Sequence, residues 1–564
     1  MACKAKRPTT SLPQPEYAAN FYGACGWTCG TLPRMATQSA NSGAISAATS
    51  GAARAVVIGS GFGGLAAAIR LQARGYQVTL VEQRDQPGGR AYVYREQGFS
   101  FDAGPTVVTA PFLFEELFEL CGERLADHLE LVPVTPFYRI RFHDGRIFDY
   151  SGDEAAMTEQ IRRMSPGDVD GYHRFLRESE RIFRVGFEEL GDVPFGRVSD
   201  MLKIVPAMMR LRSHLTVYQL VKKFIRHPDL RTVLSFHPLL VGGNPYKTTS
   251  IYALILYLER KWGVWFAKGG TGAIVKALVE LFQRHGGELR LRETVEEILV
   301  APGARKPRAI GVRLKGGATL PAQVVVSNAD VGFTYRYLLP EHARTKYTNQ
   351  RIENLRYSMG LFVAYFGTSR AYPDCAHHTI LLGPRYKGLL DDIFTRKQLA
   401  PDFSLYLHRP TATDPTLAPP GHETFYVLSP VPHLGSANPV DWESEGSRYR
   451  DRIYQMLEGA MLPGLRAAMV TTRHITPLTF RDELSSLYGS GFSVEPILRQ
   501  SAYLRPHNQS EDVSGLYFVG GGTHPGAGMP GVLSTAKVVD RLIPRLPGAA
   551  LGAAIAGSHA HVYQ

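Results

Sequence analysis

The sequence predicts an α/β protein that contains a Rossmann-like nucleotide-binding unit and at least one further domain. Between Arg54 and Glu82, a strand, a glycine-rich turn, a helix and a second strand follow one another. A strand, a glycine cluster and a helix start recur after Gly515. The chain has 564 residues, more than the roughly 250–300 at which a single hydrophobic core stops growing, which predicts several domains.

The composition is that of a globular protein and excludes several classes. Hydrophobic residues make up 44% and charged residues 20%, so the chain is neither disordered throughout nor collagen-like. The net charge is +12. No apolar run is long enough to predict a membrane-spanning helix. Five cysteines are too few for a disulfide scaffold, and Cys25 and Cys29 lack a second pair for a zinc site. We therefore expect a reducing compartment and no metal.

The two ends of the chain differ in composition from its body. Residues 1–54 hold five basic residues and one acidic residue and are rich in Ala, Ser, Thr and Gly, which predicts a segment that does not order itself. An organelle transit peptide has this composition, but an overlong start with Met35 as the first residue is the favoured interpretation. Residues 547–564 predict a flexible tail.

The segment from Arg54 to Glu82 carries a complete dinucleotide-binding pattern. Its glycines allow a tight turn, close approach of the backbone to a diphosphate and close packing of helix on strand. The helix start offers free N–H groups and a positive dipole end to phosphates. Glu82 is placed to bind ribose hydroxyls, which disfavours NADP, while FAD and NAD both remain open. The residues concerned are Gly59, Ser60, Gly61, Phe62, Gly63, Gly64 and Glu82.

Two further segments resemble known flavoproteins. The segment containing Gly88, Gly89 and Arg90 is similar to the glycine-pair-plus-arginine segment of the flavin amine-oxidase superfamily. Gly515-Leu-Tyr-Phe-Val-Gly-Gly-Gly-Thr-His-Pro-Gly-Ala-Gly-Met-Pro-Gly-Val resembles the signature of bacterial-type phytoene desaturases, the carotenoid desaturase branch of that superfamily. One departure is Thr535, where the pattern of that family prefers Gly or Ser, and we expect this small side chain to be tolerated.

This resemblance implies FAD as the cofactor and an amine-oxidase-like architecture. A discontinuous FAD-binding domain would comprise residues 55–150, 265–330 and 505–546. Residues 151–264 would form a helical, membrane-associated region, and residues 331–504 a mixed-sheet substrate domain. A single strand is expected over residues 288–298. Beyond the residues of the first motif, the implied cofactor contacts are Gln83, Arg84, Gly88, Gly89, Arg90, Gly104, Pro105, Thr106, Val295, Asn328, Gly520, Gly521, Gly522, Met529, Pro530 and Gly531.

The resemblance also implies a reaction. A phytoene desaturase converts 15-cis-phytoene to neurosporene or lycopene by hydride transfer to flavin N5 and loss of a proton, with quinone or oxygen as the final electron acceptor. Another carotenoid or thirty-carbon desaturase, a carotenoid isomerase or ketolase, and a carotenoid carrier without turnover are the alternatives. Motifs of serine hydrolases, zincins and P-loop enzymes are absent from the sequence. The number of desaturation steps and a homo-oligomeric state stay open.

Residues 201–231 form a basic amphipathic stretch with seven cations and one acid. Its apolar residues share one helical face, which by itself predicts an ordinary surface helix. A forty-carbon hydrocarbon substrate held in a bilayer favours instead a helix docked on an anionic membrane surface beside a tunnel mouth. We therefore expect a peripheral membrane protein on the cytoplasmic side, without nucleic-acid binding; organelle targeting is not favoured. The apolar residues are Val217, Leu220, Val221, Phe224 and Ile225.

The acid–base candidates are Asp200 and Lys203. They lie three residues apart on a predicted helix that faces the substrate region, where Asp200 would accept the proton. A solvated ion pair is the competing interpretation. We expect His377, His378 and His524, which lie in family-like segments, to have structural roles.

Overall fold

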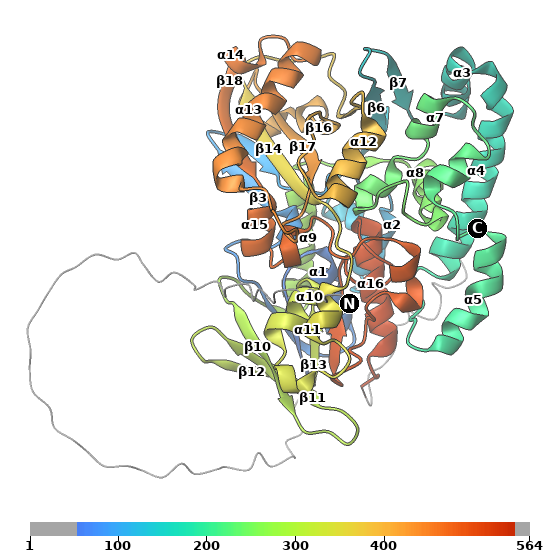
Figure 1. Ribbon diagram of the computed structural model, residues 1–564. Helices are drawn as coiled ribbons and strands as arrows, with labels where there is room; N and C mark the ends of the chain where they lie inside the picture. Colours follow the sequence, from blue (N-terminus) through green and yellow to red (C-terminus); the bar gives the residue numbers. More distant parts are fainter. Residues whose placement is uncertain (1–52, 547–564) are drawn as a thin grey trace, which may run out of the picture. The chain divides into compact units, whose positions relative to one another are not determined.

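The computed structural model describes residues 53–546, so the predictions for residues 1–52 and 547–564, including the cysteine pair, lie outside the described residues. A parallel five-stranded sheet forms the nucleotide-binding half (Figure 1). Four of its strands are short, mostly buried and rich in apolar residues, as expected where both faces are covered. The edge strand β9 is more exposed. In order across the sheet they are β19 (Leu516–Phe518), β13 (Val324–Ser327), β1 (Arg54–Ile58), β2 (Gln77–Val81) and β9 (Glu288–Arg290).

Helices cover one face of this sheet, and a small antiparallel sheet covers the other. The Ala- and Leu-rich α1 packs into one core with three further helices that come from distant parts of the chain. The helices are α1 (Phe62–Ala73), α2 (Phe112–Glu119), α9 (Thr271–Arg284) and α16 (Met529–Leu542), and the antiparallel strands are β10 (Val295–Ala301), β11 (Arg308–Leu314) and β12 (Thr319–Pro321).

Residues 288–298 form two strands where we expected one. Strand β9 ends at Arg290 and belongs to the parallel sheet, whereas β10 begins at Val295 and belongs to the antiparallel sheet. Between them, Arg292 has a φ of 59°, a left-handed conformation that cannot continue a strand. The break lets the chain change sheets beside the nucleotide-binding edge.

A mixed seven-stranded sheet forms the second half, as predicted. Only β15 and β6 pair in parallel. Helix α13 (Trp442–Ala460) packs on one face, and the other face joins a core shared with the helical region. In order the strands are β18 (Met469–Ile475), β14 (Gly360–Thr368), β17 (Glu423–Val431), β16 (Leu405–His408), β15 (His378–Leu381), β6 (Tyr138–Arg141) and β7 (Ile147–Tyr150).

Strands β6 and β7 differ from their predicted place. They lie within residues 55–150, which we assigned to the FAD-binding domain, yet they extend the seven-stranded sheet. The chain therefore crosses to the second half before Tyr138. The alternating apolar residues of β6 and β7 predict strands, but they do not predict which sheet these strands join.

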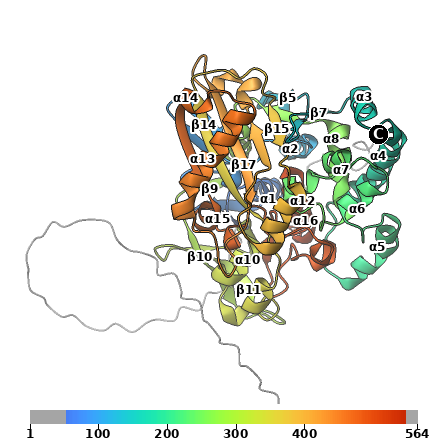
Figure 2. The ribbon, with the colours of Figure 1, turned by 45° about the horizontal axis from the view of Figure 1, so that its top comes forward.

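Six helices gather at one side of the described unit (Figures 1 and 2). The apolar face predicted around residues 217–225 packs into the core, with only Phe224 partly exposed, so these side chains do not form a membrane-facing surface. Membrane association of the stretch 201–231 as a whole stays a prediction. None of the described helices is both long and apolar enough to cross a membrane. The six are α3 (Glu154–Met164), α4 (Val169–Phe183), α5 (Val198–Arg210), α6 (Val217–Lys222), α7 (Pro228–Val233) and α8 (Leu254–Trp262).

Candidate active site

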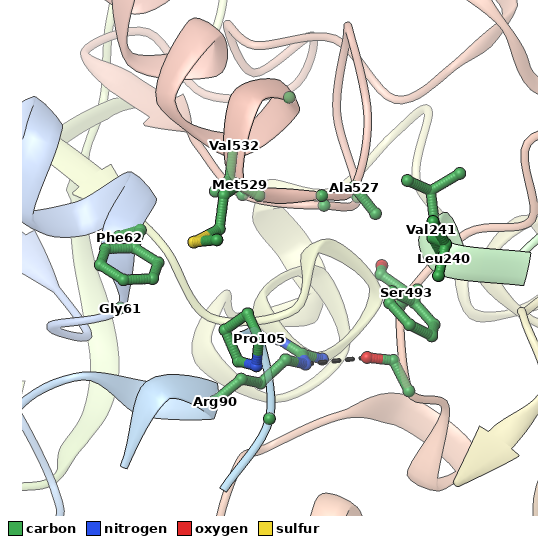
Figure 3. A pocket seen from close by; sticks show the side chains of 18 of the residues that line it. Gly61, Phe62, Arg90, Pro105, Leu240, Val241, Ser493, Ala527, Met529 and Val532 are labelled. Atoms are coloured by element: carbon green, nitrogen blue, oxygen red, sulfur yellow. Dashed lines mark hydrogen bonds between the residues drawn. The ribbon is translucent and has the colours of Figure 1, made fainter. Parts of the chain in front are cut away.

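A cavity of about 530 Å³ lies where the two sheets meet the helical region. Figure 3 shows Phe62, Pro105, Met529 and Leu240 around it, each from a different segment of the chain. Its lining combines the loops that follow the parallel strands with aliphatic side chains of the helical region. One continuous space therefore joins a nucleotide-binding edge to an apolar chamber.

Two helix N-termini open into this cavity, that of α1 at Gly61 and that of α16 at Gly528. Neither has a side-chain cap or an acidic residue in its first turn. Phe62 and Met529, the first residues of the two helices, line the cavity. Free N–H groups and the positive ends of both helix dipoles favour an anionic ligand there.

Glu82, which follows β2, is held in place by three hydrogen bonds. Ser60 donates to its Oε2 from the backbone N at 2.9 Å and from Oγ at 2.6 Å, and Arg84 N donates to Oε1 at 3.0 Å. The side chain lines the cavity and is 5% exposed. An ionised carboxylate offers about four acceptor positions, so Glu82 keeps one, on Oε1, for a ribose hydroxyl.

The glycine turn leaves no room for side chains. A Cβ at Gly61 would lie 2.9 Å from Asn328 Nδ2, and one at Gly64 would lie 2.0 Å from the carbonyl oxygen of Gly59. Gly59 itself has a φ of +88°, which favours glycine. The tight turn and the open helix ends fit the diphosphate of FAD, and the buried carboxylate fits its ribose.

Two ionisable side chains lie beside these loops. Arg90 Nε donates to Gly491 O at 2.9 Å, and burial lowers the pKa of Arg90, an effect opposed by the nearby Asp330 carboxylate. His524 Nε2 donates to Leu190 O at 2.9 Å, and burial lowers the pKa of His524 to about 4. These two residues thus add the Arg90 cation and the neutral imidazole of His524 to the cavity wall.

The predicted cofactor contacts converge on this cavity from separate parts of the sequence. Ser60 and Gly64 lie behind its wall, where Ser60 positions Glu82 and Gly64 contacts the turn. The others line it: Gly59, Gly61, Phe62, Gly63, Glu82, Gln83, Arg84, Gly88, Gly89, Arg90, Gly104, Pro105, Thr106, Val295, Asn328, Gly520, Gly521, Gly522, Met529, Pro530 and Gly531.

Asp200 and Lys203 lie elsewhere. Asp200 Oδ2 accepts a hydrogen bond from Arg197 N at 3.0 Å and so caps the start of α5. Lys203 is exposed. Neither side chain lines the cavity. This placement favours a helix-capping role for Asp200 over proton transfer.

A polar row crosses the seven-stranded sheet behind the apolar chamber. His408 on β16 lies opposite Tyr426 on β17 and His378 on β15. On β6, the ring of Tyr138 lies 5.9 Å from that of His378. Sequence reasoning singled out only one member of this row, because the alignment depends on the register of four strands.

Hydrogen bonds link the row to the cavity wall. Thr106 Oγ1 lies 3.0 Å from Tyr406 OH, which lies 2.7 Å from His378 Nδ1. His377 Nε2 lies 3.1 Å from His408 Nε2. The ring nitrogens of the three histidines lie within 4.8 Å of one another, and burial lowers the pKa of each imidazole, so the group is of a type that can ligate a metal. These hydrogen bonds already give the rings a role in supporting the wall.

Glu259 on α8 is a site residue that the sequence did not reveal. Its side chain is fully buried and lines the cavity. Tyr138 OH donates to Glu259 Oε1 at 2.8 Å, and His237 Nε2 lies 3.3 Å from Oε2. The sequence shows only that Glu259 is a single acid directly after the apolar run of residues 250–258. The same pattern is expected where a helix ends at the protein surface.

The family to which this chain belongs follows from comparison with known proteins. A model described as flavin containing amine oxidoreductase matches residues 62–539. The chain is therefore a member of the flavin-containing amine oxidoreductase family.

Within that family, the chain belongs with the bacterial-type phytoene desaturases. It is 52% identical over 490 residues to a lycopene-forming phytoene desaturase from Pseudescherichia vulneris, covering 87% of this chain and 99% of the relative. It is 47% identical over 502 residues to a neurosporene-forming enzyme from Rhodobacter capsulatus, covering 88% and 95%. An oxidoreductase structure from Methanosarcina mazei shares the fold, with a TM-score of 0.57 at 19% identity over 86% of this chain and all of that one.

Proposed function

We propose that this chain is an FAD-dependent phytoene desaturase that introduces successive double bonds into 15-cis-phytoene. The observation that carries the proposal is one continuous cavity, in which the dinucleotide-binding loops open directly into an apolar chamber. The curated relatives at 47–52% identity carry that activity in their names. The product is neurosporene or lycopene, and the relatives divide between these two outcomes.

Each part of the cavity has a defined task in this reaction. Bound FAD supplies the hydride acceptor. The N-termini of α1 and α16 hold its anionic part, and Glu82 holds a ribose. The aliphatic side chains of the helical region bind the hydrocarbon, exclude water and keep the reacting bond in contact geometry. Aliphatic residues of the helical region that line the cavity include Leu239, Leu240, Ile251, Leu254, Ile255 and Leu258.

Helix α5 supports the proposal that the enzyme docks on a membrane. None of its side chains is buried. Ile204 and Met208 on one side line the cavity, while four large apolar side chains on another side face outward. An apolar stripe over a cavity mouth suits a hydrocarbon substrate that leaves a bilayer. The stripe consists of Val198 (56% exposed), Leu202 (67%), Val205 (40%) and Met209 (65%).

Charge around the stripe favours an anionic lipid surface. Arg197, directly before α5, and Lys203 and Arg210 on α5 are all exposed. Leu504, which is 52% exposed, lies in a short helix that packs beside α5 and enlarges the apolar surface. The docking element is therefore α5, within the helical region but displaced from the face around residues 217–225.

Vesicle flotation tests the docking surface. We expect the full chain to float with phosphatidylglycerol-containing vesicles and the Leu202→Glu/Met209→Glu variant to remain at the bottom of the gradient. Ile310→Glu is the matched control, because Ile310 is 42% exposed on β11, outside the helical region. Equal flotation of the wild type and the double variant contradicts this surface.

Product analysis tests the function. The full chain with FAD, a quinone and phytoene-loaded liposomes should give coloured product, which chromatography and absorbance identify by chromophore length. Turnover with the quinone under anaerobic conditions identifies quinone as an acceptor, and turnover in air without the quinone identifies oxygen. FAD-loaded protein that binds liposomes but leaves phytoene unchanged contradicts the proposal. The next substrate is then 4,4'-diapophytoene, named for a Staphylococcus haemolyticus relative at 34% identity over 489 residues.

A further inference from the structure

Five carboxylate side chains line the cavity, and four of them belong to its nucleotide end. Glu82, Glu293 and Asp330 follow strands of the parallel sheet. Glu483 pairs with Arg84 at 2.9 Å, beside the dinucleotide-binding loops. The fifth carboxylate, Glu259, stands apart on α8 among the aliphatic residues of the chamber.

The surroundings of Glu259 leave its charge incompletely compensated. The side chain is fully buried, and Oε1 accepts a hydrogen bond from Tyr138 OH. Oε2 has no hydrogen-bond partner, although His237 Nε2 lies 3.3 Å away, itself without one. Burying a carboxylate without full hydrogen bonding is costly. A carboxylate kept in this state at the wall of an apolar chamber indicates a chemical task.

The neighbouring Tyr138 hydroxyl is suited to hold the Glu259 carboxylate in place, but not to act as the proton acceptor itself. Burial raises the pKa of Tyr138 well above its ordinary value, and the Glu259 carboxylate adds to this rise. Tyr138 therefore stays protonated and donates to Oε1, which leaves Oε2 free to take a proton. Tyr150 also packs against this site, with its ring 5.3 Å from that of His237.

We infer that Glu259 is the proton acceptor of the desaturation. At one carbon of the substrate, the C–H bond breaks and its electron pair leaves with the hydrogen as a hydride, which the flavin receives. At the adjacent carbon, the C–H bond breaks, its electron pair forms the new double bond, and its proton passes to Glu259 Oε2. The substrate loses two electrons and the flavin gains them. This inference rests on the proposed function.

Isosteric replacement tests this role. Glu259→Gln keeps the shape of the side chain and removes the acceptor, so we expect anaerobic bleaching of bound FAD by phytoene to slow by about 100-fold or more, the usual effect of a general base. Glu259→Asp keeps a carboxylate and should fall between Gln and wild type. Glu178→Gln is the control: Glu178 is a buried glutamate on α4 that pairs with Arg181 and does not line the cavity.

Two readouts separate catalysis from a purely structural role. FAD content should be equal in all variants. Deuterium at the carbon that loses the proton should give a larger isotope effect in Glu259→Gln than in wild type, whereas deuterium at the hydride-donating carbon should not. Bleaching of Glu259→Gln at the rate of Glu178→Gln overturns the inference. Failure of wild type itself to bleach would instead contradict the proposed function.

An infrared measurement covers the case in which Glu259→Gln fails to fold. Wild-type protein labelled with ¹³C-glutamate is reduced anaerobically with phytoene, and the difference spectrum is recorded. Uptake of the proton by a glutamate should add the carbonyl stretch of a carboxylic acid, shifted by the label. Glu259→Asp, whose carboxyl is unlabelled, should lack the shifted band. A fully reduced flavin without this band overturns the inference.

Discussion

Thr535 Oγ1 accepts a hydrogen bond from Gly520 N at 2.9 Å and donates one to Val532 O at 2.6 Å. Thr535 is fully buried on α16, and Gly520 follows β19 in the wall of the cavity. The hydroxyl thus satisfies a backbone N–H that the turn after the strand leaves without a ladder partner. Thr535, expected from the sequence only to be a tolerated departure from the family pattern, therefore connects α16 to the glycine loop.

This relationship predicts opposite outcomes for two small substitutions at Thr535. Thr535→Val removes the hydroxyl while keeping the volume, so a buried N–H loses its acceptor at a cost of about 1–3 kcal/mol in the free energy of unfolding. Thr535→Ser keeps the hydroxyl and should stay near wild type. Urea unfolding and FAD titration measure both effects. Equal stability of the Val and Ser variants would show that the hydrogen bond contributes nothing.

Replacing Glu82 is predicted to lower the affinity for FAD. Glu82→Gln places an amide where three N–H or O–H groups converge on two carboxylate oxygens, so one donor must face the new NH₂ group. Hydrogen bonds to charged groups contribute about 1.5–3 kcal/mol, which converts to roughly a 10- to 100-fold loss of FAD affinity. Quenching of flavin fluorescence on titration measures this. A Glu288→Gln variant, altered at an exposed site of β9, should bind FAD like wild type.

The nucleotide-binding end could be predicted because its chemistry is local. Gly59, Gly61 and Gly64 lie within one turn. Gly59 is required by its own positive φ and Gly64 by the nearby carbonyl of Gly59, while the distant Asn328 side chain adds to the requirement at Gly61. Glu82 is recognisable because it comes directly after the second strand. Short-range patterns of this kind survive in the sequence whatever the rest of the chain does.

The apolar end could not be predicted in the same way, because burial there depends on tertiary packing. The face containing Val217 and Leu220 has the same pattern whether it meets a core or a membrane, and the structure buries it. Glu259 looks like the polar end of a helix until Tyr138 and His237 are brought against it. The contacts of His378 likewise depend on the register of separate strands.

The glycine turn predicts a graded response to alanine. At Gly64 a Cβ would meet the carbonyl oxygen of Gly59 at 2.0 Å, and this backbone contact cannot yield without breaking β1 from α1. At Gly61 the contact is with the end of the Asn328 side chain, which can move. We expect Gly64→Ala to give insoluble protein. Gly61→Ala should stay soluble but lose FAD, because its methyl group occupies the space beside the helix start. Solubility and flavin content measure both, and FAD-loaded Gly64→Ala would contradict the packing argument.

The lowered pKa of His524 predicts that the free energy of unfolding falls as the pH falls. Its folded-state pKa is lowered to about 4 by burial, below the ordinary 6.5, so between these values the unfolded chain binds a proton that the folded chain does not. The contribution of His524 is fully present above pH 6.5 and is lost as pH falls towards 4. Between pH 6.5 and pH 5 the loss is about 2 kcal/mol. His524→Gln keeps an N–H donor for Leu190 O and cannot titrate, so its unfolding free energy should fall by about 2 kcal/mol less over that interval. Other buried histidines act equally in both proteins and cancel in the difference. Urea unfolding of the FAD-free proteins at the two pH values measures it, and parallel losses would show that His524 is protonated as readily in the folded chain as in the unfolded one.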